Sequence, residues 1–491
     1  MKKILATIAL VLLILAAVVV VRALTVDSKQ IQAPPVTDLT VDVPSAAERL
    51  AQALRFPTVS HDEKGHEETQ AFLDLHRHLE ASFPKTHATL TREVVGGLSL
   101  LYTWTGKRAD LAPVLLMSHM DVVPVEPGTE KQWIHGAFSG DLAEGYIWGR
   151  GAMDDKVGVL AILEAVELLL SRGFAPERTV YLAFGHDEEV NGLDGAGNIA
   201  ALLEKRGVRP DFILDEGGLI ADGFIPGLPG PVAMVSTAEK GYVSVELVAK
   251  SPGGHSSMPP ARTAIGRLGE AIVKLEKNPL PARLDGVIAS SFSYLAPEMP
   301  FGSRLFLSNL WLFEPLVKAQ SVKDPAGASR MRTTTAATII SAGVKENVLP
   351  SEARAIVNFR ILPGDSIAKV LDHVRKTVGP GLEVKKAGRA ATEPSPESDP
   401  AAPQFRMLQE TLAQVFPGII VSPNLLSGGT DTKHYQHLTK NVYRFLPYRA
   451  KEDDFERFHG TNERVAVDNY GEMIRFYAQL IRNGSGVRSS P

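Results

Sequence analysis

The sequence predicts an α/β fold in which a main domain, built on a mixed sheet, is interrupted by an inserted ferredoxin-like α+β domain. Three observations support this. Strands alternate with helices over residues 99–214, which indicates a layered fold with a largely parallel sheet. Over residues 242–385 the order becomes β-α-β-β-α-β, which is typical of a ferredoxin-like domain. From about residue 401 to residue 482 helices and strands return, so both flanks are expected to form one domain.

The chain begins with an apolar segment: Lys2 and Lys3 precede an unbroken apolar run over residues 4–21, and Arg22 follows it. A helix of that length, at about 1.5 Å per residue, nearly spans a bilayer. The run is longer than a usual signal-peptide core and no Ala-x-Ala site follows, so residues 1–22 are predicted to be an uncleaved signal anchor, with a cleaved signal peptide as the alternative. The remainder is then extracytoplasmic (periplasmic, extracellular or lumenal), or secreted after cleavage.

Residues 23–44 are polar, contain three prolines and show no period, which predicts a linker that holds the main domain away from the membrane. The first part of the main domain is expected over residues 45–239. Its elements follow from hydrophobic periodicity. In chain order they are helices 46–56 and 67–81, strands 99–104 and 114–118, helix 157–171, strand 179–185, helix 198–205 and strand 212–214.

The inserted domain is expected over residues 240–389, because the rhythm of the elements changes after Gly241. Between its first helix and its middle strands lies an aromatic-rich segment, about residues 281–332, which is too long for a plain loop. The main domain should resume over residues 390–482, before a tail over residues 483–491. The expected elements of the inserted domain are strand 242–249, helix 263–275, strands 334–342 and 353–360, helix 366–378 and strand 382–385.

Composition excludes several kinds of function. The formal net charge is −4 and the pI is about 6.4, so the chain has no basic surplus for a nucleic-acid partner. It has no cysteine, which removes disulfides, thiolate nucleophiles and sulfur ligands. Any metal ion must therefore bind to His, Asp and Glu side chains.

Histidine and acidic side chains follow the predicted strands at their carboxyl ends. His119 and Asp121 end one strand, residues 187–189 are three consecutive acids after the next, and residues 215–216 end a third. Asp154 lies in a glycine-containing turn before a helix. Each group alone could be a helix cap or a solvated turn. Because the carboxyl ends of parallel strands meet at one edge, their convergence favours a cation site.

These motifs resemble those of the M20 metallopeptidase family, which includes carboxypeptidase S, aminoacylases and N-fatty-acyl amino acid hydrolases. The resemblance covers roughly residues 45–482 and implies a zinc-peptidase catalytic domain with an inserted lid or dimerisation domain. The matching segments, in family order, are His119-Met120-Asp121, Gly149 to Lys156, Asp187-Glu188-Glu189, Asp215-Glu216-Gly217, Gly253-Gly254-His255-Ser256 and Phe458-His459-Gly460.

The resemblance implies two divalent metal ions. Nitrogen and oxygen ligands without sulfur are compatible with Zn²⁺, Mn²⁺ or Co²⁺, of which Zn²⁺ is the expected ion. Asp154 would bridge both ions, and its peptide bond to Asp155 is expected to be cis as in the family. Asp215 is favoured over its neighbour Glu216 as a ligand. The implied ligands are His119, Asp154, Glu189, Asp215 and His459.

Two further acids have implied roles in catalysis. Asp121 would hold His119, since metal-bound imidazoles usually donate their second N–H to such a group. A hydroxide that bridges the two metals is the expected nucleophile, and two metals lower the pKa of their shared water. Glu188, which is free of metal, would be the general base that moves the proton.

The inserted domain and the last segment offer substrate contacts. His255 follows a turn that exposes it, and the resemblance implies that it stabilises the oxyanion. Asn347 and Arg360 match positions that hold substrate in the family. Gly429 and Thr430 lie in a Gly-rich segment whose backbone N–H groups could cradle a carboxylate, although a plain turn fits equally well.

The expected activity is cleavage of an amide bond beside a free carboxylate, in a peptide or an N-acyl amino acid. A non-catalytic, membrane-anchored binding protein on the same fold is the alternative, and loss of a ligand or of the base would favour it. An endopeptidase is disfavoured by the closed pocket expected between two domains. The aromatic-rich segment fits either a long apolar acyl group or an extra core or dimer interface. A homodimer is expected to form through the inserted domain.

Overall fold

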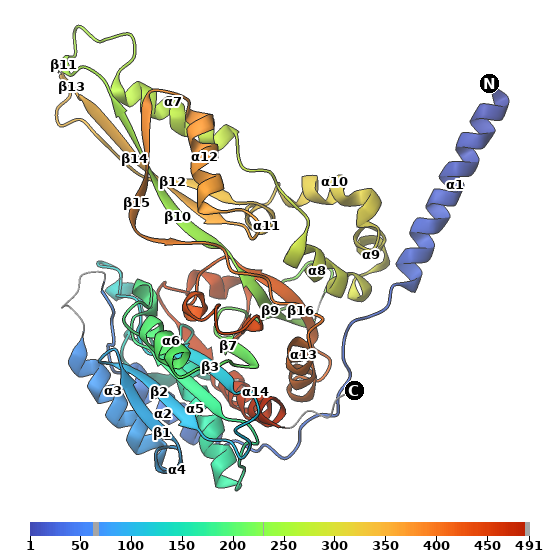
Figure 1. The fold of residues 1–491 in the computed structure, drawn as a ribbon, viewed down its shortest axis with the longest axis vertical. Helices are drawn as coiled ribbons and strands as arrows, with labels where there is room; N and C mark the ends of the chain where they lie inside the picture. The colour runs from blue at the N-terminus through green and yellow to red at the C-terminus, as the bar shows by residue number, and fades with distance from the viewer. Residues whose placement is uncertain (62–67, 229, 487–491) are drawn as a thin grey trace.

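The computed structural model describes residues 1–61, 68–228 and 230–486. A ten-stranded mixed sheet forms the centre of the main domain (Figure 1), with the order β1-β2-β6-β3-β7-β17-β9-β8-β18 and β16 paired to β9. The strands are β1 (Thr91–Val95), β2 (Ser99–Trp104), β3 (Val114–His119), β6 (Val180–Gly185), β7 (Phe212–Asp215), β8 (Ile220–Asp222), β9 (Pro231–Glu239), β16 (Ile420–Leu426), β17 (Val442–Arg444) and β18 (Arg449–Ala450).

Helices cover both faces of this sheet. Side chains alternate across a strand, so in β3 Leu116 packs into the larger core while Leu115 and Met117 pack into the smaller one. The larger core is formed with α2 (Val43–Leu54), α3 (Thr69–Ser82), α4 (Pro84–Thr89), α5 (Lys156–Ser171), α13 (Pro403–Val415) and α14 (Val467–Ser485). The smaller core is formed with α6 (Ala196–Lys205).

Three parallel strands place the predicted site residues at one edge of the sheet. In the register of β3 with β6, His119 lies opposite Gly185, directly before the acidic segment. In the register of β3 with β7, Leu116 lies opposite Leu214, so Asp215 emerges at the same edge. A small sheet of β4 (Asp141–Ala143), β5 (Tyr146–Trp148) and β19 (Arg464–Ala466) connects the segments around Asp154 and His459.

A second sheet forms the inserted domain and has the order β12-β14-β10-β15. Its helices α7 and α12 pack on it around a separate core. The β-α-β-β-α-β order is present, and the predicted α/β fold class is confirmed. The elements are β10 (Gly241–Lys250), α7 (Ala264–Lys277), β12 (Thr334–Ala342), β14 (Glu352–Ile361), α12 (Ile367–Val378) and β15 (Leu382–Thr392), with the short pair β11 (Gly254–His255) and β13 (Val348–Leu349) at the far tip.

The structure adds elements that the sequence pattern did not predict. The strand β9 belongs to the ten-stranded sheet and β10 to the four-stranded one, so the chain passes between the two sheets at Lys240. The aromatic-rich segment is helical and packs near β16. Its helices are α8 (Gly286–Leu295), α9 (Phe301–Leu307), α10 (Leu310–Ser321) and α11 (Pro325–Met331).

The N-terminal helix α1 (Lys2–Thr25) contacts α9 near its C-terminal end and projects outward from there (Figure 1), and it is long and apolar enough to cross a membrane. The predicted linker after it makes contacts with the main domain. Val36 donates its backbone N–H to Gln414, and Arg482 pairs with Asp38 at 2.7 Å. This linker therefore lies along the main domain, because its backbone and side chains find partners there.

Candidate functional site

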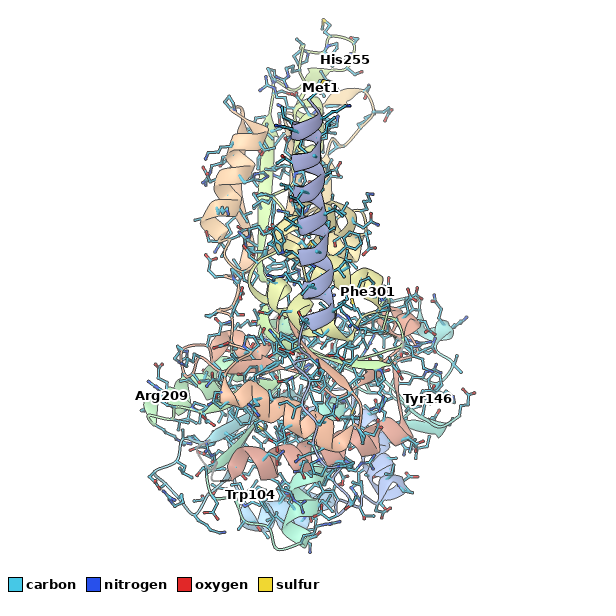
Figure 2. All side chains as sticks on the ribbon, turned by 90° about the vertical axis from the view of Figure 1, so that its right-hand side faces the viewer. Met1, Trp104, Tyr146, Arg209, His255 and Phe301 are labelled. Atoms are coloured by element: carbon cyan, nitrogen blue, oxygen red, sulfur yellow. The ribbon has the colours of Figure 1, made fainter. Side chains whose placement is uncertain are left out.

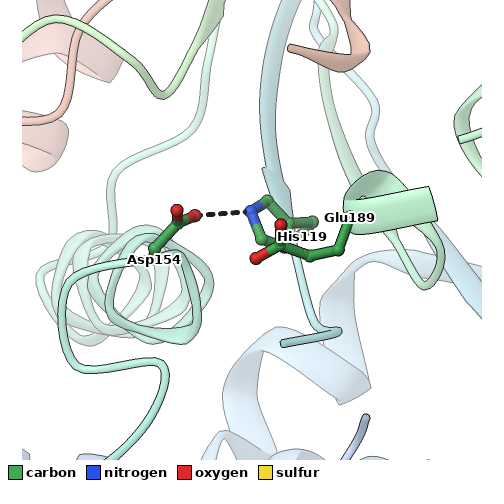
Figure 3. A group of neighbouring side chains, drawn as sticks. All are labelled: His119, Asp154 and Glu189. Atoms are coloured by element: carbon green, nitrogen blue, oxygen red, sulfur yellow. Dashed lines mark hydrogen bonds and ion pairs between the residues drawn. The ribbon is translucent and has the colours of Figure 1, made fainter. Parts of the chain in front are cut away.

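Four of the predicted ligands converge although they are up to 340 residues apart in the sequence. Figure 3 shows three of them, His119, Asp154 and Glu189. Nε2 of His119 lies 2.9 Å from Oδ1 of Asp154, and Nε2 of His459 lies 3.0 Å from Oδ2 of the same carboxylate. Nε2 of His459 is also 3.4 Å from Oε2 of Glu189. Ligand atoms of His119, Asp154 and Glu189 all lie within 4.8 Å of one another. Asp154 thus occupies the centre, between the two imidazoles.

Asp121 connects the histidine to the acidic segment. Nδ1 of His119 lies 3.4 Å from Oδ1 of Asp121 and 3.0 Å from its carbonyl oxygen. The same carboxylate accepts the backbone N–H groups of Glu188 and Glu189, each at 3.1 Å, and the hydroxyl of Ser60 at 2.7 Å. Asp121 is fully buried. It therefore fixes both the imidazole and the turn that carries the two glutamates.

Asp215 and Glu216 occupy different positions beside this cluster. Asp215 is buried at the end of β7, and its Oδ1 accepts the backbone N–H of Glu216 at 3.0 Å. Glu216 lines the cleft together with Asp154, Glu189 and His459. Asp215 is thus buried behind the lining of the cleft, whereas Glu216 reaches it.

The donor set fits divalent cations. Oε1 of Glu189 and Oδ2 of Asp215 are buried without a hydrogen-bond partner in the described part of the chain. Burial, followed by the neighbouring charge of Asp154, raises the pKa values of Glu189 and Glu216 well above the ordinary range. Burial also raises the pKa of Asp215 to about 6. Carboxylates crowded in this way need a compensating positive charge, which bound cations supply. The Asp154–Asp155 peptide bond is cis, which confirms that prediction.

Glu188 lines the cleft beside the cluster, whereas its neighbour Glu189 points at His459. Both start the short 3₁₀ turn Glu188–Val190 and both line the cleft, but among the described residues it is Glu189 whose carboxylate lies 3.4 Å from Nε2 of His459. Burial raises the pKa of Glu188 to about 7. Its carboxylate is thus placed to exchange a proton with a group in the cleft.

The cleft has a cavity volume of about 690 Å³, within the range of small-molecule sites. Of the predicted substrate residues, Arg360 and Gly429 line it. Arg360 stacks on Tyr242, its cross-strand neighbour, with 4.9 Å from guanidinium to ring centre. Phe458, from the motif of His459, lines it as well. Residues that the motifs did not identify also line it: the cations Lys240 and Lys433, and the apolar side chains Leu219, Leu426 and Phe455.

Three other predicted residues do not line this cleft. His255 and Asn347 lie together at the exposed tip of the inserted domain, where Ser256 donates its backbone N–H to the Asn347 carbonyl at 3.1 Å. Figure 2 shows His255 at the opposite end of the molecule from Trp104. Thr430 is buried, and its N–H and hydroxyl both donate to Glu239, at 3.2 and 3.0 Å.

Glu463, which sequence reasoning missed, joins the two loops that carry Asp154 and His459. Its Oε1 accepts the backbone N–H groups of Gly151 at 2.9 Å, Met153 at 2.7 Å and Asp154 at 3.2 Å. Its Oε2 accepts Nη1 of Arg150 at 2.8 Å, and the Nη2 of that arginine donates to the carbonyl of His459 at 3.1 Å. His459 has a left-handed φ of 59°, so its backbone requires such support.

We expect Glu463→Gln to weaken metal binding by about 10–100-fold, the usual cost of losing a residue that supports ligands. The change leaves Arg150 buried without its charge partner, so the loops of Asp154 and His459 should lose their relative placement. Metal affinity, measured by competition with a chelator, checks this. Glu164→Gln is the matched control, because Glu164 is also buried and paired with Arg49 at 2.6 Å. Equal metal loss in both variants would contradict a positioning role.

Comparison with known proteins agrees with this geometry. The model of the peptidase family M20/M25/M40 matches residues 115–483. Probable carboxypeptidase S-like 2 of Dictyostelium discoideum is 42% identical over 442 residues, which cover 89% of this chain and 84% of that protein. The N-fatty-acyl-amino acid synthase/hydrolase of Mus musculus is 42% identical over 444 residues, which cover 89% and 87%. Carboxypeptidase S of Saccharomyces cerevisiae is 35% identical, with 89% and 84% covered.

Solved structures share the fold. An M20 family metallo-carboxypeptidase from Sulfolobus solfataricus matches with a TM-score of 0.64 at 21% identity, over 90% of this chain and 99% of that one. Human carnosine dipeptidase 1 matches with a TM-score of 0.59 at 15% identity, over 90% and 96%. The family match spans most of the chain and includes every residue of the cluster around Asp154. The chain therefore belongs to peptidase family M20 and is a hydrolase of the metallopeptidase class.

Proposed function

We propose that this protein hydrolyses the amide bond of N-acyl amino acids or short peptides that carry a free carboxylate. The observation that carries the proposal is the composition of the cleft. The residues that line it fall into three chemical groups: the carboxylates and imidazole of the cluster, the cations Arg360, Lys240 and Lys433, and the aromatic side chains of Phe455 and Phe458. A substrate with a reactive amide, a negative end and an apolar end fits these three regions.

The proposed metal ligands are His119 and Asp215 on one side, Glu189 and His459 on the other, and Asp154 between them. A pair of zinc ions is the best match to two imidazoles and three carboxylates. When bound, such ions polarise the scissile carbonyl and lower the pKa of a water molecule. Asp121 sets the orientation of His119 through their contact, and it holds the glutamate turn at the same time.

Glu188 is the proposed proton carrier. It faces the cleft, and its backbone is fixed by the bond from its N–H to Asp121. Its carboxylate can accept a proton from the attacking water and deliver it to the leaving nitrogen, which makes the amine a better leaving group. Because Glu189 faces His459, metal binding and proton transfer are divided between two neighbours.

The cationic side of the cleft is the proposed carboxylate site. Arg360 has its guanidinium 4.9 Å from the ring centre of Tyr242, and a guanidinium can donate two parallel hydrogen bonds to a carboxylate. Gly429 borders the same cleft and offers backbone N–H. Lys240 already donates to the carbonyls of Ser329 at 2.7 Å and Arg332 at 2.8 Å, so its contribution is positive charge more than direct bonding.

The apolar side of the cleft is the proposed acyl site. Phe455 and Phe458 line the cleft with ring centres 6.3 Å apart and form an aromatic wall, and Phe224 packs on Phe455 with ring centres 5.5 Å apart. A relative is named as a hydrolase of N-fatty-acyl amino acids, which fits this wall. Two other relatives are named carboxypeptidases or carboxypeptidase-like, whose peptide substrates would place an apolar residue there.

A homodimer formed through the inserted domain is part of this proposal. His255 and Asn347 are exposed at the tip, so within one chain they have no route to the cluster. They can act on substrate only if the tip of a partner subunit reaches over the cleft. On that arrangement His255 would donate to the oxyanion that develops on the scissile carbonyl.

The proposed location is an extracytoplasmic membrane surface, with α1 as an uncleaved anchor. This helix is apolar over most of its length and almost entirely exposed, so it has no role as a core helix of a soluble domain. Lys2 and Lys3 before it favour a cytoplasmic N-terminus.

The activity is tested with the full chain, in detergent micelles, against a panel of N-acyl amino acids and dipeptides. Each substrate is paired with its methyl ester, which blocks the carboxylate and leaves the amide unchanged. We expect hydrolysis that depends on added Zn²⁺ and prefers the free acids. A metal-loaded protein that cleaves none of them, or cleaves only internal bonds of longer peptides, would contradict the proposal.

We expect Arg360→Ala to raise KM for free-acid substrates with little change for the esters. A hydrogen bond to a charged group contributes about 1.5–3 kcal/mol, or roughly 10–100-fold in affinity. Steady-state kinetics on both members of each substrate pair measure the effect. Arg354→Ala is the matched control on the same strand, because Arg354 pairs with Glu246 at 2.8 Å outside the cleft. If KM rises equally for the free acid and its ester, Arg360 does not bind the substrate carboxylate.

A further inference from the structure

The linker after α1 connects the anchor helix to the main domain through several hydrogen bonds. Gln30 binds the backbone of Val421 twice: its Nε2 donates to the carbonyl at 3.2 Å and its Oε1 accepts the N–H at 2.8 Å. Lys29 donates to Ser293 at 2.8 Å and lies 4.8 Å from the ring centre of Tyr294. A free spacer would let the body move away from the membrane, whereas this linker fixes its distance.

The anchor helix also packs directly on the helical segment of residues 286–331. Helices α1 and α9 are in contact, and Val19 and Ala23 are buried there, Leu15 is half-buried, and the other residues of α1 are exposed. The fully buried Asn309 donates from Nδ2 to the carbonyl of Val19 at 3.0 Å, and its Oδ1 accepts the indole N–H of Trp311 at 3.2 Å. One side chain thus links α1, α9 and the start of α10.

The position of the Val19 contact along α1 determines how deep α9 and α10 would lie in a bilayer. Val19 precedes Arg22, the residue that ends the apolar run, by three positions, or about 4–5 Å along a helix axis. If α1 spans a bilayer, α9 and α10 therefore lie at the level where lipid head groups meet acyl chains. Amphipathic helices that bind membranes lie at about this depth.

The surface of α9 and α10 has the side chains for such a position. Phe301, Phe306, Trp311 and Leu316, hereafter the juxtamembrane surface, are 46%, 38%, 55% and 56% exposed. Figure 2 shows Phe301 beside the lower end of α1. From residue 301 to residue 323 the chain has three basic residues and one acidic residue. Exposed aromatic side chains with a basic surplus are typical of segments that contact anionic lipid.

We propose that the juxtamembrane surface inserts into the head-group region of the bilayer that α1 crosses. This inference rests on the proposed anchor and is independent of the proposed reaction. Insertion makes the membrane attachment rigid, because α1 and the α9–α10 pair then hold the body at two points. The same helical segment ends at Ser329 and Arg332, whose carbonyls bind Lys240 of the cleft. Bilayer contact would therefore fix the height of the cleft above the lipid.

Single-cysteine fluorescence tests this in the full chain, since the natural sequence has no cysteine. Leu316→Cys probes α10, Phe301→Cys is a second probe on α9, Ile14→Cys probes the middle of α1, and Val94→Cys is an equally exposed control on the distant strand β1. Each variant carries an environment-sensitive dye and is reconstituted in phosphatidylcholine and phosphatidylglycerol vesicles, with or without nitroxide-labelled lipid.

We expect the nitroxide to remove most of the emission at positions 316, 301 and 14, and to leave position 94 unchanged. Quenching at 14 with emission at 316 and 301 equal to that at 94 would contradict the insertion while leaving the anchor intact. Loss of quenching at position 14 would overturn the anchor and this inference together. Disulfide-linked dimers of the unlabelled Leu316→Cys protein, together with no lipid quenching of the labelled protein, would assign the surface to a second copy and also overturn the proposal.

Discussion

Glu188→Gln is expected to lower turnover by roughly 10²–10⁴-fold or more, while the protein keeps its full metal content. Glutamine has the size and shape of glutamate but cannot take the proton of the attacking water. The metal ligands do not change, because Glu188 faces the cleft and its backbone N–H remains bound to Asp121. Turnover and metal content, determined on the same preparation, check both parts.

Glu188→Asp is a useful companion to that variant. It retains a carboxylate but moves it back by one methylene, so it should recover part of the lost turnover. If Glu188→Gln loses its metals, the residue is a ligand. If it keeps near-normal turnover, the proton takes another route, and the assigned role is wrong in either case.

Glu189→Gln is expected to lose metal and activity together, with turnover falling at least as far as in Glu188→Gln. Glu189 is 3.4 Å from His459, and its second oxygen is buried without a partner in the described residues. Neutral glutamine cannot supply the charge that the cations require. Metal analysis after dialysis should therefore fall below the value of about two ions per chain expected for a binuclear centre.

Glu188→Gln and Glu189→Gln can be compared directly, because both variants have the same change in charge and shape at neighbouring positions. Asp187→Gln is a poor control, since Asp187 binds the backbone N–H of Asp194 and Gly195. Glu164→Gln, remote from the cluster, is a better one and should retain both metal and activity. A Glu189→Gln protein with two bound metals and normal turnover would contradict the ligand assignment.

Much of the fold could be predicted because local patterns determine it. Apolar runs end in polar residues at the carboxyl ends of β3, β6 and β7, and the register of these strands brings His119 and the acids together. The β-α-β-β-α-β order was equally readable, since each element has its own hydrophobic period. The helices of residues 286–331 could not be predicted, because the side chains that contact other elements have no regular spacing in the sequence.

Site residues could be predicted from the sequence where they belong to a local motif. They could not be predicted where their role depends on contacts between distant parts of the chain. Glu463 and Arg150 are 313 positions apart, and no local pattern links a buried carboxylate to the loop that it supports. Lys240 and Lys433 are single lysines, which have no signature until the fold places them in the cleft. For His255 the resemblance supplies a role, but its position at the tip depends on the arrangement of domains and subunits.

The central claim is a two-metal centre at Asp154, and an anomalous diffraction map of the zinc-loaded full chain at the zinc edge tests it most directly. The account predicts two peaks on either side of the Asp154 carboxylate. One should contact His119 and Asp215, and the other Glu189 and His459, with Glu188 bound to neither. A single peak, peaks away from Asp154, or Glu188 in direct contact with zinc would contradict the account.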